Sequence, residues 1–277
     1  MLAWLQTLPE RKRQANLVFA AARWHGVPAP CPYAALRAAL LADGPSGGPI
    51  RATILERSTQ TNEVGRLACL YPAFARLAPN EPGRSVALLE VGASAGLCLY
   101  PERAGSLLTC TTTGDVPRDV LAPVVWRAGI DLSPVDVSDD EAVRWLETLV
   151  WPEQEDRRER LRAAVEIARN DPPYLVRGDL FDELPALMAQ APEDATLIVF
   201  HSAVIAYLEA AGRERFAAMM AGLVADGRCH WVSNEGPRVL PAHVPPGIDV
   251  PFGRFVLAVD GHPVALTHGH GKEMDWL

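Results

Sequence analysis

The stretch Val86–Tyr100, "VALLEVGASAGLCLY", joins a short apolar run to a glycine-rich turn. An apolar run of this length that ends at glycine predicts a buried parallel strand. The turn from Gly92 to Gly96 has two interpretations. As G-x-S-x-G it is the nucleophile elbow of an α/β-hydrolase, with Ser94 as the nucleophile. Taken together with Glu90 it is a turn whose backbone approaches a nucleotide-like cofactor.

The order of the elements around this turn favours the cofactor interpretation. A hydrolase places several strands and an oxyanion segment before its nucleophile, whereas no strand signal precedes Ser85. A serine–acid–histidine order can nevertheless be written with Ser94, with Asp179 or Asp260, and with His268. The hydrolase therefore stays as an alternative.

The remainder of the chain predicts an α/β fold. Strand-like apolar runs follow the turn and alternate with amphipathic helical segments, which predicts a doubly wound, Rossmann-like, mostly parallel sheet. Asp260-Gly261 lies between two apolar runs and predicts an antiparallel hairpin at the end of that sheet. Residues 1–80 show only helical periodicity, so we expect a helical cap there and a Rossmann-like domain over 81–277. The further strand-like runs are 107–113, 124–131, 174–179, 196–201 and 229–235.

Composition limits the classes of protein and partner. The 277 residues carry a net charge of −8, which disfavours a nucleic-acid partner and leaves a small-molecule substrate as the expectation. The five cysteines are odd in number and have neither zinc-site nor redox-pair spacing, which indicates reduced thiols in the cytoplasm. No apolar run reaches the ~18 residues of a membrane helix, so no membrane partner is expected. The oligomeric state stays open.

Several stretches resemble the bacterial domain-of-unknown-function family 2332. They extend from Thr59 to the C-terminal region, and the resemblance implies a methyltransferase-like fold without fixing a reaction. The family usually carries Asn after "AGL", where this chain has Cys98, so a ligand contact made by that Asn would be altered. The stretches are "TQTNEVGRLA", "LLEVGASAGL", "GIDLSPVDV", "VRWLETLVWPEQEDRRERLRAA", "VRGDL", "VFHSAVIAYL" and "WVSNEGP".

The glycine turn also resembles motif I of class I methyltransferases, which use S-adenosylmethionine as cofactor. By the same resemblance, Asp131 at the end of the second strand matches the acid that binds the ribose hydroxyls, and Asp179 matches the residue near the adenine amino group. Simpler roles stay open: a turn acid for Asp131, a helix N-cap for Asp179, and a turn without a cofactor. The predicted cofactor-binding residues are Glu90, Gly92, Ser94, Gly96, Asp131 and Asp179.

Polar residues at strand ends supply candidates for catalysis. His201, Asn234 and Glu235 end two predicted strands, and we expect them to face the cofactor sulfonium. His201 would be the base if the acceptor must lose a proton; the alternative is a buried, hydrogen-bonded histidine. Asn62, Glu63 and Arg66 are expected on the substrate side, or else on a solvated helix face.

Two further motifs are expected to carry no chemistry. His268 and His270 in "HGHG" lack convergent acids or cysteines, so no metal site is predicted. The "DPPY" of residues 171–174 matches a motif of amino-group methyltransferases, but it precedes a strand instead of following the fourth one. Its prolines are therefore expected to end a helix.

The sequence thus predicts an S-adenosylmethionine-dependent methyltransferase that acts on a small, unidentified acceptor. Two other functions stay open: a cofactor-free interaction protein that retains the fold, and a serine hydrolase that uses Ser94. Whether the cofactor is bound at all, and whether a general base is needed, are not decided by the sequence.

Overall fold

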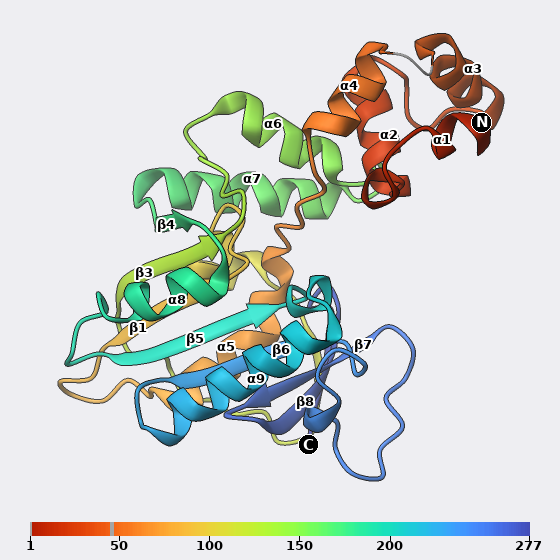
Figure 1. The fold of residues 1–277 in the computed structure, drawn as a ribbon. Helices are drawn as coiled ribbons and strands as arrows, with labels where there is room; N and C mark the ends of the chain where they lie inside the picture. The colour runs from red at the N-terminus through yellow and green to blue at the C-terminus, as the bar shows by residue number, and fades with distance from the viewer. Residues whose placement is uncertain (1, 45–46) are drawn as a thin grey trace. The chain divides into compact units, whose positions relative to one another are not determined.

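A computed structural model describes residues 2–44 and 47–277. The protein is a mixed α/β molecule whose contacts divide it into two compact units (Figure 1). The first unit comprises residues 1–61 and 136–162, and the second comprises residues 62–135 and 163–277. This division differs from the expected boundary between residues 80 and 81. Within the described residues, no helix is long and apolar enough to cross a membrane.

The first unit is built from helices. A central contact places the rings of Trp24 and Trp145 edge to face, 5.7 Å apart, with the guanidinium of Arg57 4.7 Å from the Trp24 ring centre. The N-cap of α6 is Asp139, whose carboxylate accepts from two backbone N–H groups of the first turn. The helices are α1 (Leu2–Gln6), α2 (Ala15–Trp24), α3 (Tyr33–Asp43), α4 (Pro49–Glu56), α6 (Asp140–Leu149) and the first half of α7 (Glu155–Asn170).

The second unit contains a nine-stranded, mostly parallel sheet in the order β2-β9-β8-β7-β6-β5-β1-β3-β4. From β1 the chain moves outward through β3 and β4, and then in the opposite direction through β5 and β6. The strands are β1 (Val86–Val91), β2 (Thr111–Thr113), β3 (Val124–Asp131), β4 (Tyr174–Arg177), β5 (Thr196–Ser202), β6 (His230–Glu235), β7 (Arg254–Val259), β8 (His262–His268) and β9 (Glu273–Trp276).

Both faces of this sheet are covered, which explains why its central strands are apolar on both sides. One face packs against α8 (Leu180–Met188) and α9 (Ala210–Ala225), where Leu89, Val199 and Trp231 meet Phe216 and other apolar side chains. Both helices run along this face in Figure 1. The opposite face packs against α5 (Leu67–Leu77), with the ring centres of its Phe74 and of Phe200 5.0 Å apart.

Most expected strands form, with two differences at the sheet edge. The described part of the chain before β1 is helical and contains no strand, as expected. The hairpin turns at Asp260 and Gly261, which have φ values of 51° and 82°. However, the sheet does not end there, because β9 pairs with β8, and β2 pairs with β9. Of the run 107–113, only Thr111–Thr113 forms a strand, and it lies at this edge.

Candidate functional site

The glycine turn follows β1 and packs tightly against its own chain. Gly92 has φ 72° and Gly96 has φ 67°, a region that favours glycine. A Cβ at Gly92 would lie 2.4 Å from Cγ1 of Val204, and one at Gly96 would lie 2.8 Å from Cγ of Pro173. Packing against neighbouring side chains therefore already requires glycine at both positions. The two glycines alone do not indicate a ligand.

The carboxylate of Asp131 holds this turn in place. Asp131 ends β3, which runs beside β1, and its Oδ2 accepts from the Ser94 N–H at 2.8 Å while Oδ1 accepts from the Ser133 N–H at 2.7 Å. An ionised carboxylate has about four acceptor positions. Each oxygen of this partly exposed side chain thus retains room for a second donor.

Asn62 fixes the side chain of Ser94. Its Nδ2 donates to Ser94 Oγ at 2.9 Å, and its Oδ1 accepts from the Ala95 N–H at 3.1 Å. Ser94 itself has φ 50°, an unusual value for a residue other than glycine. Among the described residues, no histidine forms a hydrogen bond with Ser94. Its hydroxyl therefore accepts from the Asn62 amide and is not paired with a histidine of the described residues.

Glu90 places a buried carboxyl group beneath the turn. The residue is 8% exposed, and its Oε2 has no hydrogen-bond partner among the described residues. Burial raises the pKa of Glu90 well above its ordinary value, opposed by the charge of Arg66 and reinforced by that of Asp131. Burial and the neighbouring Glu90 also raise the pKa of the Cys98 thiol. A raised pKa of this kind favours the protonated form of Glu90, because burial penalises the charged carboxylate.

Glu63 and Arg66 connect the turn region to the loop that follows β8. Both belong to the segment around the 3₁₀ turn η2 (Val64–Arg66) and are buried, so they do not form the solvated helix face considered as an alternative. Arg66 donates to the Gly269 carbonyl at 2.9 Å and to the Ser202 carbonyl at 2.8 Å. Glu63 Oε1 accepts from the Gly65 N–H, and its Oε2 lies 2.8 Å from His270 Nδ1.

His270 is the residue of this site that the sequence did not indicate. Its side chain is 42% exposed, whereas its partner Glu63 is buried. A buried carboxylate hydrogen-bonded to one ring nitrogen fixes the orientation of the ring, as in histidines that act as proton acceptors. "HGHG" gave no such signal, because the partner lies 207 residues away in the chain.

His201 does not have the geometry expected of a base. The ring is fully buried, and Trp231 Nε1 donates to its Nε2 at 3.1 Å. Because an indole N–H can only donate, the proton lies on Nδ1, which donates to Glu235 Oε1 at 2.8 Å. Both ring nitrogens are occupied, which is the buried, hydrogen-bonded arrangement that the sequence left as the alternative.

Glu235 and Asn234 are also held in internal networks. Glu235 Oε1 additionally accepts from the backbone N–H groups of Val204 and Ile205, at 2.9 and 3.0 Å. Asn234 donates to Ser202 Oγ at 3.0 Å and accepts from Thr267 Oγ1 at 2.7 Å. These contacts fix the ends of β5 and β6 relative to each other.

Asp179 is the N-cap of α8, the simpler of its two expected roles. Its Oδ1 accepts from the Phe181 N–H at 2.8 Å, and the residue is exposed. The preceding Gly178 N–H donates to the Asp131 carbonyl at 3.1 Å. Asp179 therefore lies close in the backbone to Asp131, although its carboxylate is engaged by the helix.

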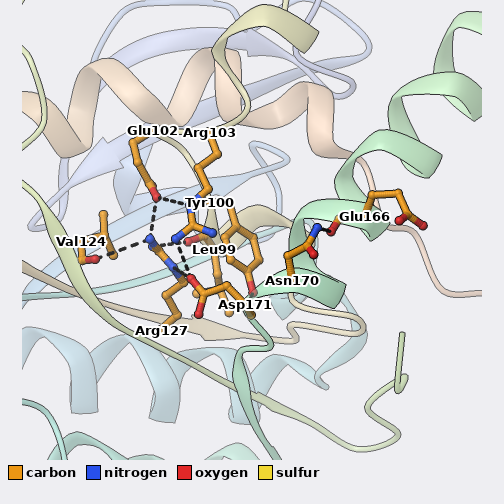
Figure 2. Close-up of polar contacts among 9 residues, drawn as sticks. All are labelled: Leu99, Tyr100, Glu102, Arg103, Val124, Arg127, Glu166, Asn170 and Asp171. Carbon is orange, nitrogen blue, oxygen red and sulfur yellow. Dashed lines mark hydrogen bonds and ion pairs between the residues drawn. The ribbon is translucent and has the colours of Figure 1, made fainter. Parts of the chain in front are cut away.

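The "DPPY" segment forms polar contacts with the chain that follows the glycine turn (Figure 2). Tyr100 donates through its hydroxyl to the Asp171 carbonyl at 2.5 Å, and Arg103 bonds to the Asp171 carboxylate at 2.6 Å. The guanidinium of Arg127 lies 4.9 Å from the Tyr100 ring centre and donates to the Leu99 carbonyl at 2.9 Å. The motif thus has a structural explanation in this chain.

The described residues contain no group of three or more histidine, cysteine or acidic side chains that could hold a metal ion. No curated protein matches the chain. A family model with the description "Uncharacterized protein conserved in bacteria (DUF2332)" matches residues 28–276, and the chain belongs to that family.

Proposed function

We propose that the protein binds S-adenosylmethionine at the carboxyl ends of β1 and β3 and transfers its methyl group to a small acceptor. The strand order supports a doubly wound, Rossmann-like arrangement, because the chain leaves β1 in opposite directions through β3 and β5. In such sheets ligands bind beyond the carboxyl ends of the strands where the order reverses. The turn from Gly92 to Gly96 and the carboxylate of Asp131 both lie at these ends.

The observation that carries the proposal is the buried oxygen Oε2 of Glu90, which has no partner among the described residues. A buried polar atom without a partner costs about 1–3 kcal/mol, so a ligand that donates to it would be favoured. S-adenosylmethionine carries an ammonium group and a sulfonium. A cation beside Glu90 would favour its ionised form, and binding would then release a proton.

The other residues of the site have roles that follow from their contacts. Asp131 has acceptor capacity for hydroxyl groups of a ribose beyond its two backbone bonds. The bound cofactor would supply an activated methyl group. His270, oriented by Glu63, would accept a proton from an acceptor that must lose one. His201 would contribute only by its hydrogen bond to Glu235.

Calorimetric titration with S-adenosylmethionine and its demethylated product tests this function. We expect binding whose observed heat changes with the ionisation enthalpy of the buffer, because Glu90 releases its proton. Glu90→Gln should remove this buffer dependence, whereas Glu81→Gln, at an exposed surface pair, should retain it. Ser94→Ala should weaken binding tenfold or less, since one neutral hydrogen bond contributes ~0.5–1.5 kcal/mol.

A flat titration with both ligands on folded protein would exclude the proposal and favour a cofactor-free interaction protein. The hydrolase is the second candidate, because φ 50° at Ser94, in the turn that follows β1, resembles a nucleophile elbow. The Asn62 amide that donates to its hydroxyl argues against it. Labelling of Ser94 by a fluorophosphonate, lost in Ser94→Ala, would replace the methyltransferase with the hydrolase.

A further inference from the structure

Cys69 and Cys110 lie side by side in the second unit. Cys69 belongs to the first turn of α5 and is fully buried, and Cys110 precedes β2 and is partly exposed. Their sulfur atoms are 4.0 Å apart, although the residues are 41 positions apart in sequence. Sequence spacing therefore could not reveal the pair.

The surroundings give the two sulfur atoms different chemical character. The thiol of Cys69 is in hydrogen-bond contact with that of Cys110, and this contact together with burial raises the pKa of Cys69. The same contact lowers the pKa of Cys110, helped by the positive charge of Arg254 on β7 and opposed by partial burial. The more exposed cysteine is thus the better thiolate, and the thiolate is the form that reacts with oxidants.

We propose that Cys69 and Cys110 form a peroxide-sensitive dithiol that oxidises to an intramolecular disulfide. In the first step the Cys110 thiolate attacks one oxygen of hydrogen peroxide. The O–O bond breaks, the departing hydroxide takes a proton to become water, and Cys110 becomes a sulfenic acid. Cys69 then loses its proton and attacks the Cys110 sulfur. The S–O bond breaks, and a second water leaves. Two thiols are oxidised, and one peroxide is reduced to two waters.

Formation of this bond brings two sulfur atoms together and links two elements of the fold. The sulfur atoms must approach from 4.0 Å to about 2.05 Å. The strand after Cys110 is paired with β9, and the Thr111 N–H donates to the Lys272 carbonyl at 2.9 Å. The product would fasten edge strand β2 to the helix that begins directly after Arg66.

The test uses the full chain at neutral pH and does not depend on any cofactor. Reduced protein is treated with hydrogen peroxide, alkylated and analysed by peptide mass spectrometry. We expect a peptide pair joined through Cys69 and Cys110, loss of two of the five free thiols, and reversal by dithiothreitol. Cys110 should react at least about tenfold faster than Cys31, which is also partly exposed but has no thiol partner described.

Single variants separate the steps. Cys69→Ser should stop at a sulfenic acid on Cys110 that dimedone traps, and Cys110→Ser should leave Cys69 reduced. Cys31→Ser is the matched control and should form the disulfide as the wild-type chain does. Circular dichroism of each variant verifies its fold. Oxidation of Cys31 and Cys110 at similar rates, or a disulfide only between chains, would overturn the proposal.

Discussion

His243 should make the stability of the protein depend on pH in a defined direction. The residue is buried, its Nδ1 lies 2.9 Å from Ser233 Oγ, and its ring packs edge to face on Trp231. Burial lowers the pKa of His243 from 6.5 to about 4, with smaller contributions from His201 and His262. Because the folded protein holds the neutral ring, this stability is complete above pH 6.5 and is lost as pH falls toward 4.

The size of the effect follows from proton linkage. At about pH 5 the ring is almost fully protonated in the unfolded chain but only about one-tenth protonated in the folded one, which costs about 2 kcal/mol relative to neutral pH. Urea denaturation at about pH 5 and about pH 7.5 measures this. Other groups titrate in the same range. The quantity compared is therefore the change in the free energy of unfolding between the two pH values, measured for His243→Asn and for the wild type.

We expect the free energy of unfolding of His243→Asn to fall by about 2 kcal/mol less than that of the wild type over this pH range. His25→Gln, at an exposed position in the first unit, is the control and should follow the wild type. Equal losses of stability in wild type and His243→Asn would refute the argument that burial keeps this ring neutral.

Two further substitutions test how the turn is built. Gly92→Ala should destabilise the protein by about 2–4 kcal/mol in urea denaturation. The new Cβ would lie against Val204, and alanine would also have to adopt a positive φ. Gly83→Ala, with φ 80° and no atom within 4 Å, should cost only about 1 kcal/mol; equal losses would disprove the steric argument. Asp131→Asn should speed hydrogen exchange at the Ser94 amide and cost about 1–3 kcal/mol, because an amide offers one acceptor oxygen where two N–H groups now bond. Unchanged exchange at Ser94 would contradict this role of Asp131.

The central strands could be predicted because their local sequences leave few alternatives. Val86–Val91 and Thr196–Ser202 are apolar runs bounded by polar residues or turn-forming glycine, and buried parallel strands have this composition. Asp260-Gly261 marks its hairpin by turn chemistry alone. In contrast, β9 is four residues long with only Met274 and Trp276 buried, so its sequence lacks a strong signal.

The polar contacts of the candidate site were less predictable than its strands. The sequence could indicate that His201 ends a strand, but only the register between β5 and β6 brings the Trp231 indole against its ring. Glu63 meets His270 through a fold-level contact between distant segments. A single sequence contains no information on such pairs, because each residue type is equally compatible with a solvent-exposed position.

The contacts of Glu63 and Arg66 with the loop after β8 also constrain when the site can form during synthesis. They close loops of 207 and 203 residues, and translation at ~5–20 residues per second needs about 10–40 seconds to span such a distance. For most of that interval the residues of η2 have been synthesised, while the residues after β8 that contact them have not. Contacts of such large sequence separation also slow folding. The segment around η2 should therefore be among the last parts of the protein to gain protection from hydrogen exchange, and a ribosome-bound chain halted before Gly269 should lack these contacts.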